Sequence, residues 1–198
     1  MRFRHAPLVG MILSIVLFAV AMAYYPGGTS FSSDTVGYNW SQNFLSSLFQ
    51  PRAYNGSPNP ARWFAIPAMF LLCLSYAFIF GSVSRRSRSK FEKKAIQIGG
   101  IGSAVYTFLV VTPMHNLMIT ISLLFFITAV LTTLHFLHTE RQTVLFAAGF
   151  VSLAVMLISC VMYYGNVLFS ALPIAQKLTF ALFAAWLLAL HYKMLDAV

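Results

Sequence analysis

Acidic residues are scarce in this chain, and none of the four lies within an apolar stretch. Asp34, Glu92, Glu140 and Asp196 fall in polar segments or near the C-terminus. Transporters coupled to protons or cations usually place a carboxylate inside a membrane span, where its burial is costly and its presence therefore functional. The sequence thus disfavours ion-coupled transport and acid–base chemistry by paired carboxylates within the membrane.

Cysteine is also rare, and the sequence lacks the common cofactor motifs. Cys73 and Cys160 both lie near the middle of apolar runs, so no loop disulfide reports on the redox compartment. No His-Glu-x-x-His motif, glycine-rich phosphate loop or serine nucleophile elbow occurs. We therefore expect no cofactor and no metal site.

Long apolar runs are what the chain has in abundance. Hydrophobic residues make up 59% of it and charged residues 9%, whereas a typical soluble domain is about 25% charged. A helix needs about 20 residues to cross a hydrocarbon core about 30 Å thick. Runs near this length cover residues 6–24, 61–83, 95–112, 116–137, 143–165 and 174–194. The pattern predicts an all-α polytopic membrane helix bundle of six transmembrane helices, forming a single integral membrane domain over residues 1–198.

Lysine and arginine are unevenly divided between the two sides of the predicted bundle, and their distribution indicates its orientation. The basic residues on the side of the N-terminus are Arg2, Arg4, Arg85, Arg86, Arg88, Lys90, Lys93, Lys94, Arg141 and Lys193, against Arg52, Arg62 and Lys177 on the other. By the positive-inside rule both termini are cytoplasmic and residues 25–60 face outward. The net charge of +9 is thus a topology signal, and no nucleic-acid partner is expected. The basic segment Arg85–Lys94 should contact anionic lipid headgroups.

The first apolar run admits a second interpretation. Arg2 and Arg4 precede it, and Ala21-Met22-Ala23 near its end matches the small-x-small pattern of a signal-peptidase site. Cleavage there would leave one span fewer, with the mature N-terminus outside. A retained first span agrees with an even number of helices and is the interpretation we favour.

The outward segment contains a predicted amphipathic helix over about residues 36–50. At about 100° per residue its polar side chains fall on one stripe and its apolar ones on the other side. The stripe holds Asn39, Asn43, Ser46 and Gln50, and the apolar side holds Trp40, Phe44, Leu45, Leu48 and Phe49. Pro51 should end the helix. The helix could lie flat at the membrane surface, or it could cap the bundle and turn its amides toward a cavity.

A histidine in a short turn suggests a polar site at the same membrane surface. His115 and Asn116 follow Pro113 between the third and fourth apolar runs. The turn between these runs is too short to extend away from the membrane surface. The candidate binding residues are Asn39, Asn43, Ser46, Asn116 and Asp34, with His115 as a candidate general base. The alternative is that these groups only cap helices and meet water, as the polar residues of any outer surface do.

Three segments carry a resemblance to a known family. They are Tyr25-Pro26-Gly27-Gly28, the stretch Asn43–Leu48, and His115-Asn116. Together they resemble a bacterial and archaeal family of six-span membrane proteins, classed as a domain of unknown function and distantly similar to DRAM/Frag-type proteins. That family tends to show Asn-x-x-Ser-acid-Leu-Gly in this loop, but here Ser47 replaces the acid and Phe49 the glycine. The resemblance implies a six-helix fold, a polar outer site and a bacterial or archaeal cell membrane, but no reaction.

Three classes of function remain after these exclusions. The first is a non-enzymatic bundle that contacts lipids or serves as an accessory to a membrane-protein partner, and the shortage of catalytic groups favours it. The second is a membrane enzyme that acts on a lipid headgroup or isoprenoid carrier at the outer face through His115. The third is a facilitator for a neutral solute, which would need small polar side chains along several spans.

Overall fold

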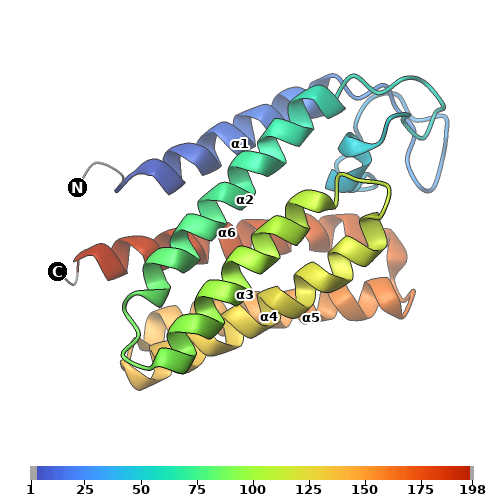
Figure 1. The fold of residues 1–198 in the computed structure, drawn as a ribbon. Helices are drawn as coiled ribbons and strands as arrows, with labels where there is room; N and C mark the ends of the chain where they lie inside the picture. The colour runs from blue at the N-terminus through green and yellow to red at the C-terminus, as the bar shows by residue number, and fades with distance from the viewer. Residues whose placement is uncertain (1–3, 197–198) are drawn as a thin grey trace.

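The computed structural model of the protein describes residues 4–196, and Arg2 of the orientation argument lies outside this range. Helices joined by turns and loops make up the described chain, and no strand forms within it (Figure 1). The predicted all-α class is therefore confirmed. The elements are α1 (Ala6–Ala23), η1 (Leu45–Phe49), α2 (Arg62–Ser84), α3 (Lys90–Leu109), α4 (His115–Thr139), α5 (Thr143–Tyr164), η2 (Phe169–Ala171) and α6 (Leu172–Asp196), where η marks a 3₁₀-helix.

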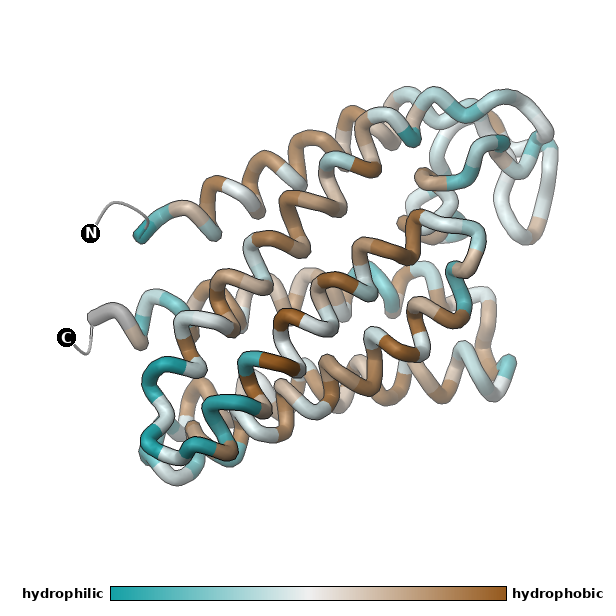
Figure 2. The backbone as a smooth tube through the Cα atoms, viewed as in Figure 1, coloured by the Kyte–Doolittle hydropathy of each residue, from teal (hydrophilic) through white to brown (hydrophobic). Residues whose placement is uncertain are grey.

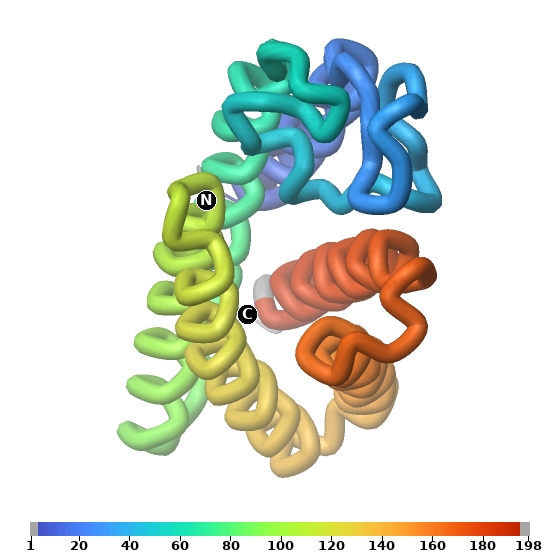
Figure 3. Tube along the Cα trace, turned by 90° about the vertical axis from the view of Figure 1, so that its right-hand side faces the viewer, coloured from blue at the N-terminus to red at the C-terminus, as the bar shows by residue number. Residues whose placement is uncertain are grey.

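The six α-helices run up and down in chain order. Neighbours in sequence pack against each other, with α1 on α2, α2 on α3, α3 on α4 and α5 on α6. Viewed along the bundle, α5 and α6 stand as a pair beside the arc formed by α2, α3 and α4 (Figure 3). We call the end that carries residues 25–60 the loop end. The opposite end, where α1 begins, α6 ends and the segment Arg85–Lys94 lies, is the basic end (Figures 1 and 2).

Five helices are long and apolar enough to cross a membrane: α1, α2, α4, α5 and the stretch Phe169–Met194, which joins η2 to most of α6. The structure thus supports an integral membrane protein, but it corrects the predicted number of six spans. The remaining α-helix, α3, begins at Lys90 and carries Glu92, Lys93 and Lys94 in its first turns. Its apolar part, 95–109, is about 22 Å long at 1.5 Å per residue, which is short of the hydrocarbon thickness of about 30 Å.

Close packing holds the less apolar α3 within the bundle. A Cβ atom at Gly99 would lie 2.8 Å from the backbone oxygen of Phe125, and one at Gly100 would overlap the side chain of Phe80. Glycine at these two positions lets α3 approach α4 and α2 more closely than any other residue could. A hydrogen bond of 3.1 Å from Ser122 Oγ to the carbonyl of Ser103 also joins α4 to α3.

The predicted amphipathic helix over residues 36–50 does not form. A turn covers residues 40–42, and only the five-residue 3₁₀-helix Leu45–Phe49 is helical. The buried Asn43 explains the difference. Its Oδ1 accepts from the Asn39 backbone N–H at 2.8 Å, and its Nδ2 donates to the Gly28 carbonyl at 2.8 Å. Side-chain bonds of this kind compete with helical ones, and the next residue, Phe44, is extended with ψ 153°.

The contact between α3 and α4 predicts a difference between two glycine substitutions. Gly99→Ala should lower the free energy of unfolding by about 1–3 kcal/mol, because the added methyl group overpacks the helix crossing. Gly81→Ala on α2 is the matched control, since a Cβ there meets nothing within 4 Å. Thermal unfolding in the same detergent checks both variants. Equal midpoints for the two would contradict the close approach of α3 to α4.

Candidate functional site

A cavity of about 450 Å³ extends from the loop end toward the middle of the bundle. Its walls come from η1, from the α5–α6 turn and from helices α2 to α6, so the separation of the α5–α6 pair from the other helices creates it. Pockets of about 300–1,000 Å³ hold drug-sized ligands in proteins. The cavity is therefore large enough for a small molecule or for part of a lipid.

The polarity of the wall changes with depth. Polar side chains gather near the loop end, and they include Ser46, Gln50, Tyr54, His115, Asn116, Tyr163, Tyr164 and Gln176. Deeper positions are mostly apolar, and they include Met69, Ala104, Leu123, Phe126, Met156 and Phe183. None of the residues that line the cavity is a lysine, arginine, aspartate or glutamate. The wall thus matches an uncharged amphipathic molecule, with polar groups at one end of the cavity and apolar groups at the other.

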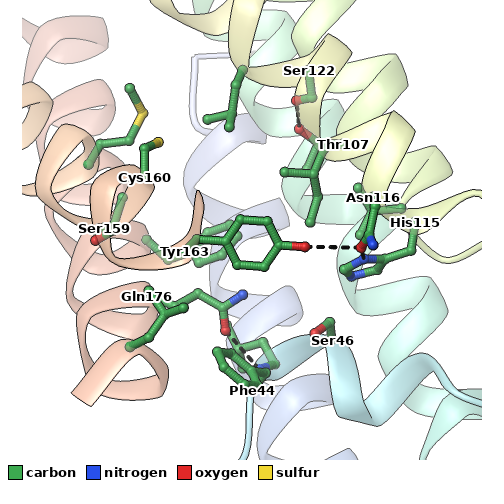
Figure 4. Close-up of a pocket in the computed structure, with 18 of the residues that line it drawn as sticks. Phe44, Ser46, Thr107, His115, Asn116, Ser122, Ser159, Cys160, Tyr163 and Gln176 are labelled. Atoms are coloured by element: carbon green, nitrogen blue, oxygen red, sulfur yellow. Dashed lines mark hydrogen bonds between the residues drawn. The ribbon is translucent and has the colours of Figure 1, made fainter. Parts of the chain in front are cut away.

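Hydrogen bonds between neighbouring elements surround the cavity (Figure 4). Thr107 of α3 and Ser122 of α4 lie 2.5 Å apart through their hydroxyls. Gln176 of α6 accepts from the backbone N–H of Leu45 at 3.0 Å, which ties the outer loop to the helix pair. The hydroxyls of Ser159 on α5 and Thr179 on α6 are hydrogen-bonded at 3.2 Å. The polar residues of the wall therefore also fix the relative positions of the helices.

His115 lies in this wall and is oriented by two neighbours. Its Nδ1 lies 3.0 Å from Oδ1 of Asn116, and Tyr163 of α5 donates its hydroxyl proton to the same oxygen at 3.0 Å (Figure 4). The other ring nitrogen, Nε2, is buried and has no hydrogen-bond partner among the described residues. The ring is thus held in place, and Nε2 is left without a hydrogen bond among the described residues.

Two further polar atoms of cavity-lining residues are buried and unpaired within the described chain. They are the hydroxyl oxygens of Ser47, which is 2% exposed, and Tyr76, which is 7% exposed. Buried polar groups in proteins nearly always have a partner, which can be protein, water or ligand. Together with His115 Nε2, three polar atoms of cavity-lining residues thus have no hydrogen-bond partner among the described residues.

The structure brings some of the predicted site residues together and separates others. His115, Asn116 and Ser46 all line the cavity (Figure 4). Asn39 and Asp34 lie elsewhere in the outer loop. Asn39 Oδ1 accepts from Ser41, and the exposed Asp34 accepts from Ser33.

Asn43 has a structural position rather than a place in the cavity wall. Besides the two bonds of its side chain, its carbonyl accepts from the ammonium of Lys177 at 2.6 Å and from the Tyr38 hydroxyl at 3.2 Å. The Lys177 ammonium also donates to the Pro173 carbonyl at 3.0 Å and lies 5.5 Å from the ring centroids of both Tyr38 and Trp40. Lys177 thus fastens the outer loop to α6 by means of carbonyls and aromatic rings.

Sequence reasoning missed most of the polar wall. Thr107, Ser122 and Tyr163 lie within the predicted apolar runs, and Tyr76 lies in the middle of α2. Their recurrence on several helices was a usable signal. It is a weak one, because a serine or threonine in an apolar helix usually bonds to the carbonyl four residues earlier, and such a residue can then face any direction.

Comparison of the chain with models of protein families, with curated proteins and with solved structures found no match. The resemblance to a six-span family therefore stays a prediction. A fold by itself does not imply a function, which belongs to the site. Within the described residues, no group of three or more histidine, cysteine, aspartate or glutamate side chains is placed to hold a metal ion.

The bonds of Asn43 predict a local effect on the outer loop. Asn43→Ala leaves the Asn39 N–H without its acceptor and the Gly28 carbonyl without its donor. The substitution should therefore destabilise this region by about 1–3 kcal/mol. Asp34→Ala is the control, because that side chain is exposed and bonds only to its neighbour. Hydrogen exchange of residues 26–50 should be faster in the first variant and unchanged in the second. Unchanged exchange in Asn43→Ala would contradict the structural role.

Proposed function

We propose that this integral membrane protein is a non-enzymatic lipid-binding helix bundle, which holds the polar end and the first part of the chain of one lipid-like molecule in its cavity. The observation that carries the proposal is the buried, unpaired Nε2 of His115 in the wall of a cavity of about 450 Å³. An empty apolar cavity needs no occupant, but unpaired polar atoms in a cavity wall favour one.

The change of polarity with depth supports an amphipathic occupant. Hydrogen-bonding groups at the loop end suit a polar head, and Phe126, Met156 and Phe183 farther in suit a hydrocarbon chain. Ligand pockets commonly combine a mostly apolar wall with a few polar groups that fix orientation. A lipid taken from the surrounding membrane would supply both parts.

Binding is a better match to the geometry than catalysis by His115. The Nε2 atom has the freedom that a general base requires, and Asn116 with Tyr163 provides the orientation. However, no described hydroxyl or carboxylate hydrogen-bonds to Nε2, which is the contact that a nucleophile and its base make. The same nitrogen serves directly as an acceptor for a bound molecule.

We also propose that the loop end faces outward and the basic end faces the cytoplasm of a bacterial or archaeal cell. The concentration of positive charge in Arg85–Lys94 supports this orientation through the positive-inside rule. In that position the segment would contact anionic headgroups of the inner leaflet. The cavity would then open toward the outer leaflet.

Impermeant thiol labelling checks the orientation. In a background of Cys73→Ala and Cys160→Ala, a cysteine introduced by Asn55→Cys should react from outside intact cells, since residue 55 is exposed at the loop end. One introduced by Arg88→Cys at the basic end should react only after the cells are opened. The reverse pattern would invert the proposed topology.

Filling the cavity should displace the lipid. Ala104 is 5% exposed and lines the cavity, whereas its neighbour Val105 is 52% exposed and lies outside it. Ala104→Phe should lower the amount of lipid that remains bound after purification by about tenfold, because the ring occupies the ligand's volume. Val105→Phe should retain the lipid at the level of the parent protein. Native mass spectrometry of both variants measures this, and equal retention would count against the proposed function.

A further inference from the structure

We infer that the cavity selects an uncharged lipid alcohol, whose hydroxyl group donates a hydrogen bond to His115 Nε2. The inference rests on the proposed function and names the chemical class of its ligand. It follows from the charge of the cavity wall and from the position of the proton on the His115 ring.

The charge of the wall argues against a charged headgroup. No lysine, arginine, aspartate or glutamate lines the cavity. The nearest cation along the chain, Lys177, follows the lining residue Gln176, but its ammonium is turned to the carbonyls of Asn43 and Pro173. Moving a phosphate or an amine from water into a partly buried space without a counter-charge is unfavourable. The wall therefore favours a neutral ligand.

The hydrogen bonds around Asn116 assign the proton of His115. Oδ1 of Asn116 has two lone pairs and no proton, so both of its partners must donate to it. Tyr163 donates its hydroxyl proton, and His115 Nδ1 at 3.0 Å donates the other. A neutral imidazole has a single N–H. With that proton on Nδ1, the buried Nε2 is a lone pair that can only accept.

An acceptor in the wall requires a donor on the ligand. A hydroxyl group is the neutral donor that a lipid offers at the end of a hydrocarbon chain, whereas an ether, an ester or a ketone has only acceptors. Ser46 lines the same cavity, so its hydroxyl is a second group that can hydrogen-bond to an alcohol oxygen. A site built to bond a hydroxyl group rejects analogues that lack it, because its own polar atom is then left unpaired.

Cys160 provides a reporter of occupancy within the protein itself. It lines the cavity and is partly exposed, whereas Cys73 is buried and is not among the lining residues. In a Cys73→Ala background the rate of alkylation of Cys160 by N-ethylmaleimide follows access to the cavity. The probes are dodecan-1-ol, its methyl ether and dodecyl phosphate in lipid nanodiscs, compared at equal mole fraction in the membrane. They share one chain and differ only at the head.

Dodecan-1-ol should slow alkylation at a concentration about tenfold lower than the methyl ether, since one buried hydrogen bond separates the two. Dodecyl phosphate should protect least. In His115→Ala the difference between alcohol and ether should shrink to less than about twofold. Equal protection by alcohol and ether in the parent protein, or strongest protection by the phosphate, would overturn the assignment of the head while leaving the lipid-binding function intact. If no probe protects Cys160, the proposed function itself fails.

Asn116→Asp tests the proton assignment with almost no change of shape. A carboxylate accepts a hydrogen bond from Nδ1–H as the amide oxygen of Asn116 does, so the proton stays on Nδ1 and Nε2 keeps its lone pair. The preference for alcohol over ether should therefore persist in this variant, while overall thermal stability stays close to that of the parent. Loss of the preference for the alcohol would refute the role of His115 Nε2 as acceptor.

Discussion

The need to pair polar groups in a space without bulk water governs this structure. A membrane offers no solvent to an unpaired donor or acceptor, so such groups must find partners inside the protein. Here several of these partners lie on different elements: Tyr163 reaches Asn116 from α5 to α4, and Gln176 reaches the backbone of Leu45 from α6 to the outer loop. At the loop end, hydrogen bonds thus join the α5–α6 pair to the rest of the bundle, whereas deeper in the bundle close packing does so, as between the rings of Phe126 and Phe183, whose centroids lie 4.7 Å apart.

The cavity is a consequence of that arrangement. Where α3 meets α4, glycine permits close contact and leaves no space, as the short distances at Gly99 show. Between the α5–α6 pair and the other helices the cavity remains open toward the loop end, and the outer loop, fastened by Lys177, forms part of the wall there. The same hydrogen bonds that hold the pair there orient His115 and leave its Nε2 without a partner. The hydrogen bonds that position the helices therefore also orient the candidate binding residue His115.

Hydropathy sufficed to predict the membrane class and the approximate helices, because burial in lipid imposes long apolar runs. It failed at α3, whose first turns are charged and whose place in the bundle depends on tertiary packing at Gly99 and Gly100. The helical pattern over residues 36–50 failed because one buried side chain, Asn43, bonds to the backbone in place of a helical turn. At the site, His115, Asn116 and Ser46 could be named from their polarity and depth. Tyr163 and Tyr76 could not, since the direction of a side chain on an apolar helix depends on contacts between distant segments.

The most direct measurement is an experimental structure of the protein in lipid nanodiscs, with co-purified lipid retained. The account predicts elongated density in the cavity, with its polar end about 2.7–3.2 Å from His115 Nε2 and its chain against Phe126 and Phe183. It also predicts that Tyr163 and Asn116 keep their hydrogen bond. A bundle in which α5 and α6 close onto α3 and α4 and remove the cavity, or in which the His115 ring turns out into water, would contradict it.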